Sequence, residues 1–414
     1  MASQMRASES ASLKPGSAAA GQEAEGTAAI HPAQPSRFVI EGVPRVHFYE
    51  GGPRCPEDII LPSVLRALLE HVGEGDYGCR HCMARYPDCK ITCTYSYLVG
   101  ITGAGSFLSW KEGWHGDNGA IFYMSDDPAA PERRAFEAIG YAHEWVEKEP
   151  GRDNEAEFRR RIVESVRDRK MPVLGYGVIG PPEPSIIAGY DEGGDVLVGW
   201  SFFQGIPDFN AGVEFEPSGY FRKRDWFKDT HCLLVVGGKQ PKPSLGDTYR
   251  DALKWALYVT RTPMVKPQPD APEWYRNRHN GLSAYTAWAE HLLRDEEWPA
   301  GDEAVLRQHH NVHNDAVGKV AEARWYGSQF LIQASDPDHL HYNMAEELLR
   351  AAACYAGEHE LMWKVWDLAG GNGNPEAYRK LADPEVRRQM VSIILQSRDK
   401  CAEAAEHIER ALAK

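Results

Sequence analysis

Four cysteines lie between residues 79 and 93 at spacings that suit a metal ion: Cys79, Cys82, Cys89 and Cys93. Two closely spaced pairs joined by a short loop can wrap four thiolates around one tetrahedral ion. Coordination would also stiffen a segment that is too polar to pack by itself. We therefore expect a structural zinc ion, because four protein ligands leave no open position for catalysis. An iron–sulfur cluster, disulfides and free thiols are the alternatives.

The composition excludes several classes of function. The chain has 60 acidic and 46 basic side chains and a formal net charge of -14, so we expect no nonspecific binding to nucleic acid or anionic lipid. No apolar stretch approaches the span of a bilayer, and no secretory signal is evident, so we expect a cytoplasmic protein. In that compartment the eight cysteines are better suited to be thiols or metal ligands than disulfides.

The first part of the chain combines a helix with short strands. Residues 61–72 have leucines at helical spacing, with a proline at the start and Gly73 at the end, and they predict an amphipathic helix. Short stretches rich in β-branched residues predict strands over 172–179, 185–190, 196–200 and 232–236. The sequence Asp-Glu-Gly-Gly at 191–194 predicts a tight turn between the middle two strands.

Beyond a Pro-rich stretch the pattern becomes helical. Periodic segments predict four main helices over 281–293, 302–333, 343–368 and 383–412, with short connections that favour antiparallel neighbours. The fold class is therefore α+β followed by an all-α bundle. The predicted divisions are a disordered segment 1–36, an α+β domain 37–262 with the four-cysteine insertion 79–93, a linker 263–272 and a helical bundle 273–414.

Several polar residues share the apolar faces of the predicted bundle helices. His313 and Arg324 fall in register with apolar residues, so we expect both to face the interior. The next helix places Glu347, Glu358 and His359 near its own apolar stripe. Such groups on facing helices make either a metal or acid–base site or buried polar pairs that satisfy one another, and we favour the pairs. Bulky aromatic residues on these helices suit the core or a homo-oligomer interface.

Three stretches together resemble the papain-like fold of the bacteriocin-leader peptidases and, more closely, the N-terminal domain of the butirosin biosynthesis protein H family. The helix that ends at Gly73 looks like the nucleophile helix of that fold. The sequence YLVGITGAGSFLSW over 97–110 is similar to the Gly-rich turn that follows it, and SIIAGYDEGGDVLVGW over 185–200 resembles the hairpin that carries the catalytic His and Asp. The resemblance implies a papain-like cysteine-peptidase-like domain and a role in biosynthesis.

The catalytic residues of that fold are not at their expected places. The nucleophilic Cys should lie near the start of the first helix, which falls near Ile60. The general base His falls on Glu183, and the orienting Asp falls on Trp200 and Ser201. A thiolate and an imidazole are both required for that mechanism, so we expect a degenerate triad.

This departure leaves two interpretations of the domain. In the first, the cleft that holds the catalytic residues in the papain-like fold, here near Ile60, Glu183 and Trp200, binds a small amide-, amine- or peptide-like ligand. In the second, Cys55 or Glu183 carries out acyl transfer or amide chemistry, as the resemblance to the butirosin family implies. Both residues also suit plain structural roles, as a loop thiol and a strand-end carboxylate. A third possibility is a scaffold whose helical bundle dimerises or binds a partner.

A Trp-rich loop and a Gly-rich turn are the remaining candidates for ligand contact. Trp110, Trp114 and His115 lie in or beside a glycine-rich loop and, with Trp200, suit an aromatic rim of a pocket. Such a loop can equally fold back on the core. Gly100–Gly105 (GITGAG) lacks the Lys-Ser/Thr of a phosphate loop, so we interpret it as a turn where backbone approaches backbone or ligand.

Overall fold

The computed structural model describes residues 35–46, 57–75, 77, 90–148, 151, 153–265 and 275–414. Outside these ranges lie Cys55, Cys79, Cys82 and Cys89, most of the segment 1–36 predicted to be disordered, and most of the linker predicted over 263–272. The chain forms two compact units. Unit 1 comprises Met1–Glu41 and Trp145–Val235, and unit 2 comprises Gly42–Glu144 and Val236–Lys414.

The predicted α+β class is confirmed, and its sheet is antiparallel from β9 to β7. The strands run in the order β3-β9-β4-β5-β6-β8-β7, and β1 also pairs with β5. Their bounds are β1 Phe38–Val39, β3 Tyr141–Glu147, β4 Val173–Tyr176, β5 Pro184–Asp191, β6 Val196–Trp200, β7 Val213–Phe215, β8 Phe221–Arg224 and β9 Cys232–Lys239. The four strands predicted from the sequence correspond to β4, β5, β6 and β9.

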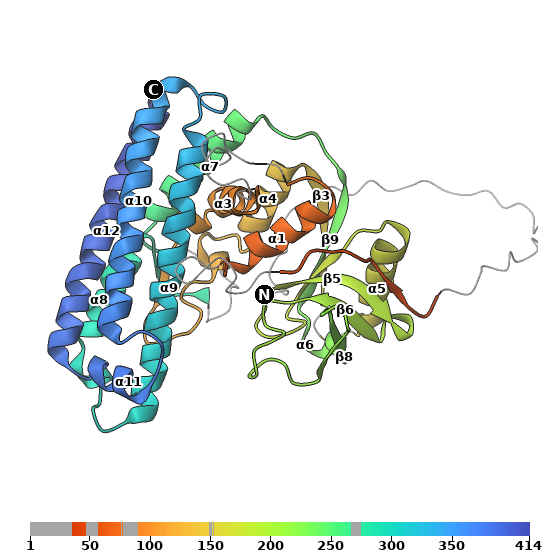
Figure 1. Cartoon of the computed structure of the whole chain (residues 1–414), viewed down its shortest axis with the longest axis horizontal. Coiled ribbons are helices and arrows are strands. Elements are labelled where there is room, and N and C mark those ends of the chain that lie inside the picture. The colour runs from red at the N-terminus through yellow and green to blue at the C-terminus, as the bar shows by residue number, and fades with distance from the viewer. Residues whose placement is uncertain are drawn as a thin grey trace, which may run out of the picture. The chain divides into compact units, whose positions relative to one another are not determined.

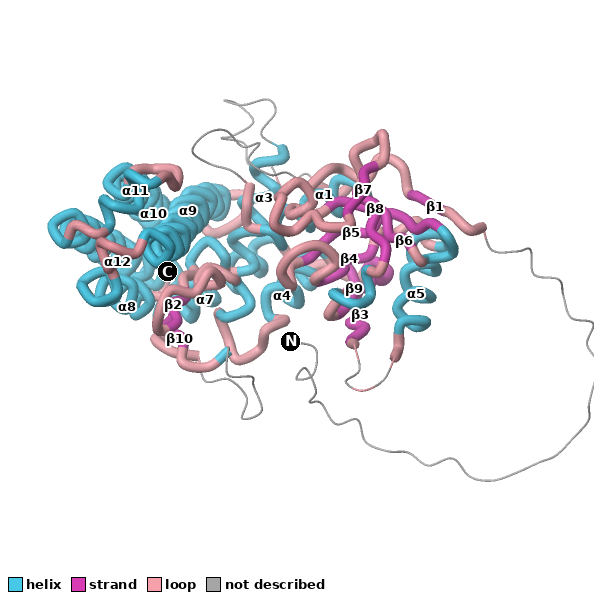
Figure 2. The backbone as a smooth tube through the Cα atoms, turned by 90° about the horizontal axis from the view of Figure 1, so that it is seen from below, coloured by secondary structure: helices cyan, strands magenta, loops and turns pink. Residues whose placement is uncertain are grey.

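The hairpin predicted between β5 and β6 is confirmed. A short 3-10 turn, η5 (Glu192–Gly194), joins the two strands, and Gly193 adopts φ 68°. That backbone conformation favours glycine. Unit 1 also contains α5 (Glu155–Val163), the π-helical turn η4 (Glu164–Asp168) that continues it, and α6 (Trp226–Asp229). Figure 2 shows α5 beside the strands of this unit.

Unit 2 begins with helices that include the predicted amphipathic helix, now α1 (Ile60–His71). Nearly every residue of α1 is buried, including Arg66, whose guanidinium pairs with Glu57 and Glu70. The other elements before the bundle are α3 Lys90–Thr102, η2 Ala104–Ser106, β2 Ser109–Lys111, η3 Ile121–Tyr123, α4 Ala130–Ile139, α7 Leu245–Arg261 and β10 Arg278–Asn280. Strands β2 and β10 form a separate two-stranded sheet.

The four main bundle helices are confirmed as α8 (Leu282–Leu293), α9 (Glu303–Ala334), α10 (Tyr342–Ala369) and α12 (Pro384–Leu412). Helices α9, α10 and α12 run side by side as long helices in Figure 1, and the shorter α8 packs on α12. A short helix, α11 (Pro375–Leu381), and a 3-10 turn, η7 (Asp295–Glu297), lie in the connections. Side-chain oxygens of Asp302 and Asp383 cap α9 and α12 by accepting backbone N–H bonds, as expected of Asp at an N-cap.

The compact units divide the chain differently from the predicted domains. The segment 42–144 groups with the bundle helices in unit 2, while most of the sheet forms unit 1. The division falls within β3 and β9, so it does not coincide with the Pro-rich stretch at 263–272. The physical reason lies in packing, because α3 and η2 lie directly on α9.

Candidate functional site

The start of α1 is closed by a side chain from α9. Glu322 is buried, and its Oε1 accepts hydrogen bonds from the backbone N–H of Asp58 at 2.7 Å and of Ile59 at 3.1 Å. The hydroxyl of Tyr95 donates to the same oxygen. The first N–H groups of an α-helix have no partners within the helix and attract anions. The carboxyl of Glu322 therefore accepts from the two backbone N–H groups that directly precede Ile60, the first residue of α1.

The environment of Glu322 favours its neutral form. Burial raises the pKa of Glu322 well above its ordinary value, and the nearby carboxylate of Asp58 adds to this effect. Hydrogen bonds from Tyr95 and the two backbone amides oppose the shift without cancelling it. A protonated carboxyl still accepts hydrogen bonds through its carbonyl oxygen. This group is therefore a buried acceptor that holds α1 against α9.

A second buried network joins α9 to the Gly-rich turn. The guanidinium of Arg324 donates to Glu358 at 2.7 Å and to the backbone carbonyl of Gly105 at 2.7 Å, and both charged side chains have 0% exposure. Glu358 also accepts hydrogen bonds from Tyr285 and Ser397. The prediction that Arg324 faces the interior is confirmed. Glu358 forms a buried ion pair with it, which is the buried polar pairing that the sequence favoured over a metal or acid–base site. Each charged side chain of this network therefore has a buried partner of opposite charge.

The glycines of the turn allow this close contact. A Cβ at Gly105 would lie 3.0 Å from the backbone of Gly327 on α9, and a Cβ at Gly100 would collide with the ring of Phe330. The expectation that backbone approaches backbone in GITGAG is therefore confirmed for Gly105 and Gly327.

The tryptophans predicted at a pocket rim lie in a buried aromatic cluster. Trp110 has 0% and Trp114 has 7% exposure. Trp110 stacks on Trp288 with ring centroids 5.6 Å apart, and Trp114 stacks on His309 at 5.0 Å. This burial agrees with the second interpretation of the sequence, in which the loop folds back on the core and does not form the rim of a pocket. His115 is exposed, so ligand contact at this loop stays a prediction.

The sequence did not identify the polar groups that fix this cluster. The indole N–H of Trp114 donates to Glu297 at 2.7 Å, and the same carboxylate lies 2.9 Å from Nδ1 of His291. These hydrogen bonds hold the pKa of Glu297 below its ordinary value against the opposing effect of burial. The group joins the Trp114 loop to η7 and therefore has a clear structural role.

The two candidates on the sheet lie in unit 1. Glu183 is half-buried and directly precedes β5, which is the strand-end position that the sequence predicted. Trp200 ends β6, is 8% exposed, and packs against Tyr220 with ring centroids 4.7 Å apart. Ile60 belongs to unit 2, so the structure does not place the three residues of the predicted cleft in one unit.

Of the four cysteines predicted to bind zinc, only Cys93 falls within the described residues. Cys93 lies in α3 and is buried. Its backbone carbonyl accepts a hydrogen bond from Gln333 of α9 at 2.9 Å. The catalytic candidate Cys55 is also outside the described residues.

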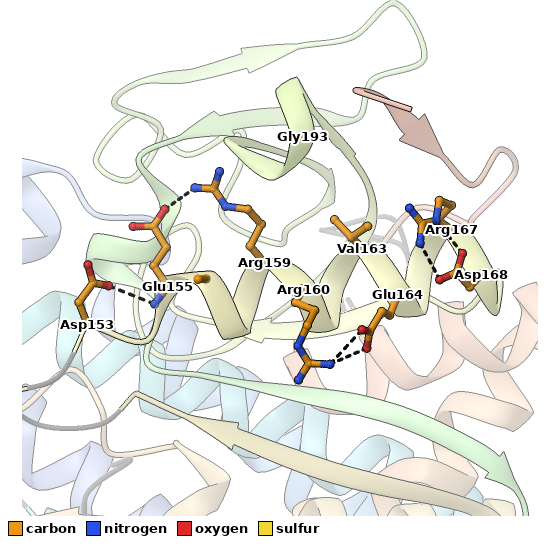
Figure 3. A pocket seen from close by; sticks show the side chains of 10 residues that line it. Asp153, Glu155, Arg159, Arg160, Val163, Glu164, Arg167, Asp168 and Gly193 are labelled. Carbon is orange, nitrogen blue, oxygen red and sulfur yellow. Dashed lines mark hydrogen bonds and ion pairs between the residues drawn. The ribbon is translucent and has the colours of Figure 1, made fainter. Parts of the chain in front are cut away.

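A groove of about 640 Å³ follows one side of α5 in unit 1. Its lining combines four carboxylates and three guanidiniums from Asp153, Glu155, Glu164, Asp168, Arg159, Arg160 and Arg167. Figure 3 shows Asp153 just before α5 and the other six side chains projecting from α5 and η4, with Arg160 beside Glu164 and Arg167 beside Asp168. The sequence did not predict a groove at this position. Its surface offers both signs of charge over a short distance.

A mixed cluster of metal-ligand types lies between α10 and α12. One potential ligand atom each from Cys354, Glu403 and His407 lies within 4.8 Å of the others. Burial raises the pKa of the Cys354 thiol to about 11. Among the residues that the structure describes, this is the group whose chemistry suits a metal ion.

No model of a known protein family matches the chain, and no curated protein matches it. Within the described ranges, no helix is both long and apolar enough to cross a membrane.

Proposed function

We propose that this chain is a papain-like-fold protein without thiol chemistry that binds a small amide-, amine- or peptide-like ligand. The observation that carries the proposal is the closure of α1 by Glu322, whose carboxyl accepts from the N–H groups of Asp58 and Ile59. In the resembling peptidases, a cysteine near this helix start is the nucleophile. The same N–H groups and the helix dipole would stabilise a thiolate there.

The groove along α5 supports a ligand that carries both signs of charge. Arg160 and Glu164 form an exposed ion pair at 2.9 Å, with side chains 54% and 43% exposed. Exposed pairs of this kind contribute about 0–1 kcal/mol, so a ligand can replace them at little cost. A zwitterionic peptide presents an ammonium group to the carboxylates and a carboxylate to the guanidiniums. The volume of about 640 Å³ also falls within the usual range for small-molecule sites.

The test is a calorimetric titration with the dipeptide alanyl-glutamine at low salt. We expect saturable binding by the parent and at least about tenfold weaker binding by Arg160→Gln and Glu164→Gln, equivalent to about 1.4 kcal/mol. Arg350→Gln is the matched control, because Arg350 and Glu346 form the same kind of exposed pair one helical turn apart on α10. N-acetylalanine methylamide, which lacks both charges, should bind more weakly. No binding by the parent, or equal binding by the parent and all variants, would show that the groove along α5 is not the binding site.

The enzyme interpretation is the alternative outcome. It requires that the parent converts an amide or acyl substrate and that Cys55→Ala or Glu183→Gln abolishes the turnover. Equal turnover by the parent and both variants would remove these residues from the mechanism.

The zinc proposal for Cys79, Cys82, Cys89 and Cys93 has its own test. Native mass spectrometry before and after alkylation should find one zinc ion and four protected thiols. Full alkylation of these cysteines without loss of metal would contradict the proposal.

A further inference from the structure

Three ligand-type side chains meet between two helices of the bundle, where Cys354 and His407 are buried and Glu403 is exposed. Cys354 lies on α10, and Glu403 and His407 lie on α12. Glu403 and His407 are four residues apart, so they share one helix face. Their ligand atoms and that of Cys354 lie within 4.8 Å of one another. One ion placed among the three could therefore reach all of them with small side-chain adjustments.

The donor set favours one class of metal. A thiolate, an imidazole and a carboxylate together are typical ligands of zinc, whereas magnesium and calcium prefer oxygen alone. Three protein ligands leave the fourth tetrahedral position for water or another small ligand. The site is accessible from solvent, because the Glu403 side chain is 48% exposed.

His407 has the outer partner that a metal-bound histidine usually has. Its Nδ1 lies 2.7 Å from Oε2 of Glu347, which is on α10 seven residues before Cys354. When Nδ1–H donates to this carboxylate, Nε2 carries the lone pair that can bind a metal. Arg410 lies 2.9 Å from Nδ1 and also donates to Glu347, so it competes for Nδ1 in the metal-free chain.

We propose that Cys354, Glu403 and His407 bind a zinc ion, with Glu347 as the carboxylate that orients His407. Lys400 donates to Oε2 of Glu403 at 2.8 Å, and the Cys354 thiol is hydrogen-bonded to the same carboxylate, so an ion would take the place of the thiol proton between these two groups. The site shares no residue with the four cysteines predicted to bind zinc, Cys79, Cys82, Cys89 and Cys93. Its fourth position is open to a water molecule or to a thiol or carboxylate ligand from solution.

The test compares metal uptake by the full chain and by single variants. Metal-free, reduced protein is titrated with zinc in competition with a chromophoric chelator, and separately with cobalt(II) as a spectroscopic probe. We expect the parent to bind one more equivalent of zinc than Cys354→Ser or His407→Ala. Because other cysteines are the same in all three proteins, the difference isolates this site.

Matched variants separate ligands from bystanders. Glu347→Gln should keep the parent's stoichiometry and bind the extra equivalent about 10–100-fold more weakly. Glu406→Gln, on the same helix and exposed, and His341→Ala, an exposed histidine, should bind like the parent. Far-ultraviolet circular dichroism confirms that each variant is folded. Equal zinc uptake by the parent, Cys354→Ser and His407→Ala, or a cobalt spectrum that Cys354→Ser leaves unchanged, would overturn the proposal.

Discussion

Oε1 of Glu322 lies 2.7 Å from the backbone nitrogen of Asp58 and fixes the start of α1 to the middle of α9. These residues are 264 positions apart, and both belong to unit 2. A buried carboxyl from one helix therefore satisfies the backbone N–H groups at the start of another, and its role there is packing.

Substitution of Glu322 should separate its hydrogen-bonding role from its charge. Glu322→Gln keeps an acceptor oxygen for the amides of Asp58 and Ile59, so we expect its stability to lie near that of the parent. Glu322→Ala leaves the two N–H groups and the Tyr95 hydroxyl without this acceptor, which should cost at least about 1–3 kcal/mol. Urea unfolding followed by circular dichroism measures the difference. Equal losses of unfolding free energy in Glu322→Gln and Glu322→Ala would show that the acceptor oxygen of Glu322 does not determine the stability.

The pH dependence of stability should report the neutral form of Glu322. Its pKa is raised in the folded protein, so the stability it contributes is full below its ordinary pKa of 4.5 and is lost as pH rises through the folded value. The slope is at most about 1.4 kcal/mol per pH unit. Glu322→Gln should remove this slope. A parent and variant with parallel profiles above pH 4.5 would contradict the assignment.

The buried pair of Arg324 and Glu358 should be strongly coupled. Glu358→Gln leaves the Arg324 guanidinium without its counter-charge and should cost about 3–5 kcal/mol of unfolding free energy. The exposed pair of Glu346 and Arg350 is the control, and Glu346→Gln should cost less than about 0.5 kcal/mol. Denaturant unfolding of both variants gives the comparison. A small loss for Glu358→Gln would mean that Tyr285, Ser397 and the backbone carbonyls compensate for the missing charge.

His313 should make the bundle sensitive to acid. Burial lowers its pKa from 6.5 to about 3, with a smaller effect from His310. Its stabilising contribution is therefore full above pH 6.5 and is lost as pH falls toward the folded value, by about 1.4 kcal/mol per pH unit. His313→Gln retains an acceptor for the Trp288 indole N–H, which lies 3.2 Å from Nδ1, but cannot titrate. Thermal melts from pH 7 to pH 4 should show a smaller acid-induced loss for this variant than for His341→Ala.

Local periodicity was enough to predict the helix α1, the strands β4, β5, β6 and β9, and the four bundle helices. It also predicted that His313 and Arg324 face the interior, because both fall on one apolar stripe of α9. Glu322 was missed because it lies off that stripe. The long helix packs against α10 on one side and against α3 and η2 on another, so it has buried residues on more than one face. A single stripe cannot reveal the second face.

The other missed features depend on residues that are distant in the sequence. Cys354 and Glu403 meet only because α10 and α12 pack side by side, and the sequence does not specify which turns of the two helices are adjacent. The predicted aromatic rim shows the same difficulty, because Trp114 is covered by His309 and Trp298, which come much later in the chain. The charged side chains of α5 and η4 pair with one another at the surface, an arrangement that links residues four positions apart along the chain.

One nuclear magnetic resonance measurement tests most directly whether the chain binds a peptide-like ligand without thiol chemistry. Alanyl-glutamine is incubated with the parent protein, and saturation transfer and the free amino acids are recorded in the same sample. The account predicts saturation transfer from protein to dipeptide, with no release of alanine or glutamine above the protein-free control. Release of free amino acids by the parent that Cys55→Ala abolishes would contradict it.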